Sequence, residues 1–338
     1  MNLFNLKVPY EQTHPHLKKI LETKDIFKMD VLQDWSKGFI DRDGKNKFIK
    51  EFQTTFNSSF WELYIFAVLR ELRRIKGNNF NINLDNHAPD FHLPNLNLAI
   101  EATVALNAEN DISEDCWLEP NELDSITECN IKSIIRLSNS ILSKSKKYLN
   151  SYEKLPHIKN CAYIIAIQDF SQPHSYLGAN RNIEAILYDY YVDEDKDRNG
   201  TSLYGESIQQ VTKNNGSPIK LGLFNNEEYS HISAIIFNPM ATMGKVTALS
   251  NDPRNNCIFR HLRYNHNSPT PYIEIDKKST YLEHLFDGMT IYHNPFAKKP
   301  LQPTIFEHKK ISQIQIVNGE KFGFIPYKHL LFRSVFSA

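Results

Sequence analysis

Two carboxylates, Asp90 and Glu101, lie in the stretch of this chain whose residue types best suit a specific chemistry. The stretch reads Ala88-Pro-Asp-Phe-His-Leu-Pro-Asn-Leu-Asn-Leu-Ala-Ile-Glu-Ala-Thr103. Carboxylates are preferred ligands of hard divalent cations, and a bound cation can activate water. The pattern therefore suggests a metal site. A turn aspartate after a proline and a solvated strand glutamate would account for the same residues, and this alternative stays open.

A hairpin would bring the two carboxylates together. Residues 90–93 and 96–105 read as strands joined by a two-residue turn. In that register Asp90 lies diagonal to Glu101, at a backbone separation of roughly 7–8 Å. A turn longer by two residues would keep both carboxylates on one face. Because side chains alternate along a strand, we expect Glu101 on a partly open face and Ile100 on the apolar core face.

The elements that must position these residues follow a definite order. Apolar patterning predicts a buried helix over 59–76, a strand over 80–84, the hairpin, a long helix over 125–148 and buried strands over 161–167 and 232–237. Ser59 and Glu62 have the spacing of a capping box, which would place the first helix start at Ser59. This order predicts an α/β fold with a mixed central sheet flanked by helices.

The order of elements and the local motifs resemble those of the PD-(D/E)xK nuclease superfamily. The likeness covers about residues 57–170 and includes Pro89-Asp-Phe and Ile100-Glu-Ala-Thr, with Phe60-Trp-Glu-Leu-Tyr on the first helix. Together these segments look like a bacterial branch of that superfamily whose role is unassigned. The resemblance implies a restriction-endonuclease-like αβββαβ core with extra C-terminal elements.

The resemblance also implies a set of site residues. Asp90, Glu101 and the main-chain carbonyl of Ala102 would hold Mg²⁺ or Mn²⁺, and Glu62 on the first helix would assist. The implied activity is that of a metal-dependent endonuclease acting on nucleic acid, with DNA as the expected substrate and a role in defence or restriction. Glu62 has a second interpretation as a mere capping residue, and both remain open.

One position departs from the superfamily pattern. Thr103 stands where a catalytic lysine is expected two residues after the glutamate, and threonine cannot replace the cation that offsets charge in the transition state. Lys144 shares a helical stripe with Leu137, Ile141 and Tyr148, so it could take over this role. It could also be a surface lysine whose stem packs on the helix. If no cation compensates, the protein would be a degenerate nuclease-like protein that binds nucleic acid or a protein partner.

Basic residues of the second helix are the expected contacts with the nucleic-acid backbone. Arg136 and Lys147 could each bind a phosphate, which makes binding salt-dependent and carries no sequence information. A homodimer is compatible with this interpretation, and no membrane partner is expected.

The composition and the absence of certain motifs narrow the classes of protein to which this chain could belong. The chain has 338 residues with 39 basic and 39 acidic side chains, so no overall charge draws it to nucleic acid or membrane. Its four cysteines form no CxxC pair, which favours a reducing cytoplasm over a disulfide or zinc-cluster protein. No phosphate-binding GxxxxGK[ST] loop or GxSxG motif occurs. We expect an N-terminal extension over 1–56, the core over 57–240, and a C-terminal region of unassigned role over 241–338 packed on the core.

Overall fold

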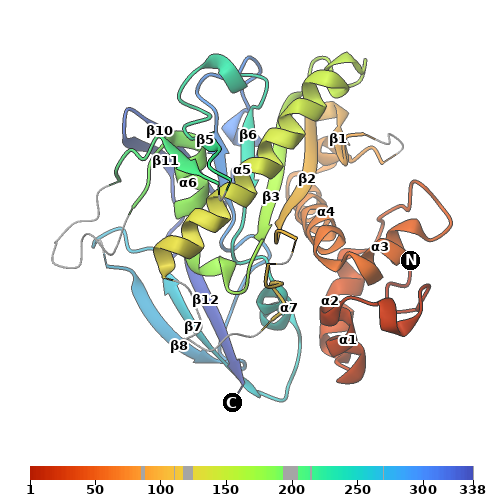
Figure 1. Ribbon diagram of the computed structural model, residues 1–338. Coiled ribbons are helices and arrows are strands. Elements are labelled where there is room, and N and C mark those ends of the chain that lie inside the picture. Colours follow the sequence, from red (N-terminus) through yellow and green to blue (C-terminus); the bar gives the residue numbers. More distant parts are fainter. Residues whose placement is uncertain are drawn as a thin grey trace.

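A seven-stranded mixed sheet forms the centre of the protein (Figure 1). The computed structural model describes residues 1–84, 88–109, 111–116, 125–192, 205–213, 215–268 and 270–337. Across the sheet the strands are β1 (Phe91–Leu93), β2 (Leu98–Leu106), β3 (Ala162–Phe170), β6 (Ala234–Phe237), β9 (Thr290–His293), β10 (Ser312–Val317) and β11 (Glu320–Phe324). The expected α/β fold with a mixed central sheet is therefore confirmed.

The strand direction changes three times across the sheet. Strands β2, β3 and β6 are parallel, β1 and β9 run antiparallel to their neighbours β2 and β6, β10 is parallel to β9, and β11 returns antiparallel. The parallel pairs β2–β3 and β3–β6 are joined by connections that contain helices, the usual crossover between parallel neighbours. Strands β3 and β6 are buried almost throughout, in accord with their continuous apolar runs.

Helices cover both faces of the sheet. In chain order they are α1 (Pro15–Glu22), α2 (Ile26–Trp35), α3 (Lys47–Thr54), α4 (Phe56–Lys76), α5 (Ile126–Asn150), α6 (Arg181–Tyr188) and α7 (Met243–Leu249). One apolar core joins α1–α4 to the face of β2 that carries Leu98 and Ile100. A second core joins α5 and α6 to the opposite face, which carries Ala99 and Ala105. Both faces of β2 are thus covered. Within the described ranges, none of these helices has the length and apolar character needed to cross a bilayer.

Two local expectations were wrong, and each has a physical reason. Helix α4 begins at Phe56, three residues before Ser59, so Ser59 is buried inside the helix and forms no capping box with Glu62. Residues 80–84 form no strand. They follow a short 3₁₀ turn and contribute a single bridge, between Asn83 and His92. The expected three consecutive strands are therefore two strands and a bridge.

The chain after residue 240 is not a separate layer. It contributes β9, β10 and β11 to the central sheet. It also forms a second sheet of β12 (Leu330–Ser337), β7 (Cys257–Arg263) and β8 (Tyr272–Lys277). A small hairpin of β4 (Gln210–Thr212) and β5 (Pro218–Lys220) lies before it in the chain. The expected boundary at residue 240 is therefore no structural boundary, because the sheet continues across it.

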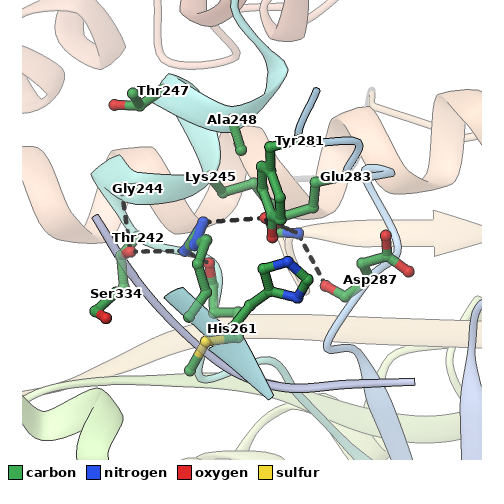
Figure 2. A network of polar contacts seen from close by, with 12 residues as sticks. Thr242, Gly244, Lys245, Thr247, Ala248, His261, Tyr281, Glu283, Asp287 and Ser334 are labelled. Atoms are coloured by element: carbon green, nitrogen blue, oxygen red, sulfur yellow. Dashed lines mark hydrogen bonds and ion pairs between the residues drawn. The ribbon is translucent and has the colours of Figure 1, made fainter. Parts of the chain in front are cut away.

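A buried polar network links the second sheet to α7 (Figure 2). The Nζ of Lys245 lies 2.6 Å from the Oε1 of Glu283, and both side chains are inaccessible to solvent. Arg333 of β12 approaches the other carboxylate oxygen at 3.3 Å and donates to the carbonyl of Met240 at 2.8 Å. Tyr281 also donates to Glu283, at 2.7 Å. These contacts connect α7, the segment that carries Tyr281 and Glu283, and β12 through charged side chains that are buried from solvent.

Candidate functional site

Asp90 lies at the outer edge of β2, where pairing with β1 ends. The hairpin turn contains four residues, so Phe91 pairs with Ile100 and Leu93 with Leu98. Extending this register by one residue places Asp90 opposite Glu101 and on the same face. The turn is longer by two residues than the simplest expectation, and the shared face is retained because side chains alternate with a period of two.

The backbone of Ala102 completes this edge. Its N–H donates to the Oδ2 of Asp90 at 2.7 Å. In an antiparallel pair the N–H and C=O groups of one residue point to the same neighbour, so the carbonyl of Ala102 also points to the edge at which Asp90 lies. This arrangement suits the expected use of that carbonyl as a ligand.

Glu101 is buried rather than partly open. Only 1% of its surface is exposed, because α5 covers this face of β2. Its Oε1 lies 2.7 Å from the Nζ of Lys144 and 3.0 Å from the Nζ of Lys147. Its Oε2 accepts a hydrogen bond of 3.0 Å from the hydroxyl of Tyr152. The expectation of an open face was wrong, and the cations that offset this burial both come from α5.

Lys144 lies where the helical stripe predicts. Leu137, Ile141 and Tyr148 are buried against the sheet, and Lys144 projects from the same side of α5 to Glu101 with 23% of its side chain exposed. The lysine absent from position 103 is thus matched in space by a lysine from α5. Thr103 itself is half-buried on β2 and pairs in register with Ile167 of β3.

Glu62 joins the site from α4, on the other side of β2. Because the helix begins at Phe56, Glu62 is an interior helix residue whose side chain is not used as a cap. Its Oε1 lies 3.2 Å from a guanidinium nitrogen of Arg42, and the same nitrogen is 3.9 Å from the Oδ1 of Asp90. Arg42 also donates to the carbonyl of Asp90 at 3.1 Å. A single guanidinium therefore lies between the two carboxylates.

Arg42 and Tyr152 were missed from the sequence. Arg42 stands in an Asp-Arg-Asp-Gly turn before α3, where nothing in the local pattern distinguishes it from a surface residue. Tyr152 follows α5 in a short 3₁₀ turn. Its position one step beyond Tyr148 on the helical stripe is the only sequence signal that could have indicated it.

Burial and mutual repulsion raise the pKa of both acids near Arg42. For Asp90 the pKa rises to about 7, chiefly because of burial and then because of the nearby Glu101. For Glu62 it rises to about 8, through burial and the charge of Asp90. Arg42 opposes both increases, and the Ala102 N–H and Lys144 also oppose that of Asp90. Such raised pKa values are typical of sites that bind a cation or exchange protons.

A polar cavity of about 240 Å³ opens beside Asp90. Glu62, Arg42 and Asp90 form part of its wall, and the loop and helix around Asp41, Asp43, Lys47 and Glu51 form the rest. Asp90 thus lies between this cavity and the buried Glu101. The cavity offers oxygen ligands and room for a cation with its water molecules.

The remaining expected contact residues lie at different places on α5. Lys147 is 48% exposed and forms part of the site through Glu101. Arg136 lies two turns before Lys144. Its guanidinium donates to the carbonyls of Leu106 and Asn107 at the end of β2, so its hydrogen bonds there serve the fold.

Comparison with known proteins gave no match: no family model fits the chain, and no curated protein or solved structure is significantly similar. The resemblance to PD-(D/E)xK nucleases therefore depends on the sequence motifs alone.

Proposed function

We propose that this protein is a metal-dependent nuclease that hydrolyses phosphodiester bonds of nucleic acid. One observation carries the proposal: the amine of Lys144 lies 2.7 Å from the carboxylate of Glu101, opposite Asp90. Asp90, Glu101 and Lys144 would thus form the combination of two acids and a lysine that is typical of the superfamily, although residue 103 is threonine. Glu101 and Lys144 are 43 residues apart in sequence and lie on two different elements, an arrangement that the ordinary patterning of a surface helix does not require.

The available donors fit a hard cation. Asp90 and Glu62 offer carboxylate oxygens and Ala102 offers a carbonyl, with Glu101 adjoining, and Mg²⁺ and Mn²⁺ prefer such ligands. The bound ion would lower the pKa of a water molecule and offset charge on the scissile phosphate. Asp90 and Glu62 must lose their protons to bind it, which their raised pKa values delay to neutral or alkaline pH.

The chain's own residues then have distinct tasks. Lys144 would orient the attacking water and stabilise the extra negative charge that develops on the phosphate. Glu101 holds Lys144 in place through the ion pair. Lys147, which is more exposed, would contact a neighbouring phosphate. Water would attack phosphorus and release a proton to solvent, the bond to the leaving oxygen would break, and that oxygen would take up a proton from solvent.

The second candidate function is a degenerate nuclease-like protein that binds nucleic acid or a protein partner. Charge balance favours it: even when Glu62, Asp90 and Glu101 are all ionised, their three carboxylates are matched by three cations, Arg42, Lys144 and Lys147. A site neutralised in this way attracts a divalent ion only if one of its own cations moves away.

A panel of substrates tests the proposal. Supercoiled and linear double-stranded DNA, single-stranded DNA and RNA are each incubated with the full chain and Mg²⁺ or Mn²⁺, with EDTA as control. We expect metal-dependent cleavage, with DNA preferred. Binding without cleavage of any substrate, together with no Mn²⁺-dependent rise in Tm, would favour the degenerate protein. A defence role, a cytoplasmic location and a homodimer remain further proposals.

A further inference from the structure

A second group of potential metal ligands lies away from the proposed nuclease site. His14 and His16 stand at the start of α1, and Glu114 and Asp115 lie in the segment after β2. The Nε2 of His16 is 3.0 Å from the Oε2 of Glu114. Two short segments separated by 98 residues therefore bring two imidazoles and two carboxylates together.

The spacing of the ligand atoms suits a single small cation. One ligand atom each from His14, Glu114 and Asp115 lies within 4.8 Å of the other two. Ligand atoms around a tetrahedral zinc ion, with bonds of about 2.0–2.2 Å, are roughly 3.4 Å apart. Side-chain rotations that bring these atoms closer by at most about 1.4 Å would give that spacing. His16 lies outside this group of three and pairs with Glu114.

Surrounding residues hold these ligands in place. The amide of Asn57, which is buried at the start of α4, donates to the Oε1 of Glu114. The ring of Phe56 stacks on His14 at a centroid distance of 5.6 Å and packs at an angle on His16 at the same distance. Supporting contacts of this kind orient metal ligands and maintain their affinity.

The charges of the group are incomplete without a cation. The Glu114 side chain is only 9% exposed, and burial of a carboxylate is costly unless an opposite charge compensates it. Among the described residues, the ion pair of Glu114 is with His16, which is charged only when protonated. A divalent ion would offset both Glu114 and Asp115 at neutral pH.

We propose that His14, Glu114 and Asp115 form a binding site for one first-row transition cation, with Zn²⁺ as the expected ion. The mixed nitrogen and oxygen ligands distinguish it from the all-oxygen nuclease site, because imidazole favours Zn²⁺ over Mg²⁺. The ion would tie the segment after β2 to α1 and α4. This inference does not depend on the proposed nuclease function.

Metal titration of the full chain tests the site. Protein freed of metal with a chelator is titrated with Zn²⁺ by calorimetry, and with Co²⁺ by visible absorption, whose bands report the ligand geometry. We expect one Zn²⁺ per chain that Mg²⁺ does not displace, and a Zn²⁺ affinity at least ~10-fold lower in His14→Ala and Asp115→Asn.

Matched variants distinguish the proposed Zn²⁺ site from the proposed nuclease site. Glu109→Gln alters an exposed carboxylate of the same segment, and Asp90→Asn alters the nuclease site; both should keep the wild-type Zn²⁺ affinity. Circular dichroism checks that each variant is folded. The proposal is overturned if the wild-type chain binds no Zn²⁺ at micromolar concentration, or if His14→Ala and Asp115→Asn bind it as well as the wild type. Loss of Zn²⁺ binding in Asp90→Asn alone would place the ion at the nuclease site instead.

Discussion

At the level of single residues, Glu62 and Asp90 are acids whose environment favours the protonated form. Their side chains keep 20% and 26% of their surface exposed, yet the protein around them raises the pKa of Glu62 to about 8 and that of Asp90 to about 7. The unfolded chain releases these protons near pH 4. Between pH 4 and pH 8 the folded state therefore binds more protons than the unfolded state.

This difference predicts how stability depends on pH. Because the folded state holds more protons, the free energy of unfolding falls as pH rises from about 4 to about 8. In EDTA, Glu62→Gln should be close to wild type at pH 4.5 and more stable than wild type at pH 8.5, by about 1–3 kcal/mol. Urea denaturation at the two pH values measures this. A Gln variant that is less stable at pH 8.5 would show that Arg42 keeps Glu62 ionised and stabilising.

Arg42 should compete with the metal. Its guanidinium lies between Glu62 and Asp90, where a divalent ion would need the same oxygens. At pH 9, where both acids are ionised, Arg42→Gln should bind Mn²⁺ more tightly by roughly 10-fold, or about 1.4 kcal/mol. Mn²⁺ titration followed by electron paramagnetic resonance measures the change. Arg74→Gln, which removes an arginine paired on the surface with Glu71, serves as control, and weaker Mn²⁺ binding in Arg42→Gln would contradict the account.

Lys144 can be compared with a neighbour of identical chemistry. Lys144→Met removes the amine that contacts Glu101, whereas Lys146→Met removes an exposed amine of the same helix. We expect Lys144→Met to lower the rate of DNA cleavage by about 10²–10³-fold, the usual effect of losing one group that stabilises transition-state charge. Lys146→Met should retain the wild-type rate. Equal rates for the two variants would remove Lys144 from the mechanism.

At the level of elements, the sequence could predict most of the site's framework. The alternation in β2 separates Ile100 from Glu101, and the stripe on α5 directs Lys144 to the sheet; both follow from strand and helix periodicity. The exact start of α4 and the length of the turn at Pro94 could not be predicted, because element ends depend on tertiary packing. Glu62 illustrates the consequence, since an apparent capping residue is an interior helix residue.

The buried polar network around Glu283 connects several elements, and its contribution to stability can be measured (Figure 2). Burial lowers the pKa of Lys245, and the nearby Glu283 opposes that effect. Lys245→Met should lower the free energy of unfolding by about 3–5 kcal/mol, because it leaves the carboxylate of Glu283 with less compensation in a site without water. Lys309→Met, at an exposed position, should change it by less than about 0.5 kcal/mol. Chemical denaturation provides both values, and equal stabilities would mean that Arg333 and Tyr281 suffice for Glu283.

At the level of the whole molecule, the strands after residue 240 were beyond local sequence patterns. Strands β9, β10 and β11 are short and lie in a proline-interrupted region, and their partners are set by long-range pairing rather than by local propensity. Arg42 is similar, because this loop residue, 20 positions before Glu62, meets the carboxylate of Glu62 only in the folded chain. The local residues therefore indicated which side chains lie near Asp90 and Glu101, whereas the complete charge balance of the site required the three-dimensional structure.

Mn²⁺-dependent cleavage of supercoiled plasmid by the wild type and by Asp90→Asn tests most directly whether Asp90 holds a catalytic metal ion. Asp30→Asn, at an exposed carboxylate of α2, is the matched control. We expect wild type and Asp30→Asn to convert the plasmid to nicked or linear product, and Asp90→Asn to do so at least ~100-fold more slowly, because it loses a metal ligand. Cleavage at the wild-type rate by folded Asp90→Asn, or no cleavage by the wild type with either metal, would contradict this expectation.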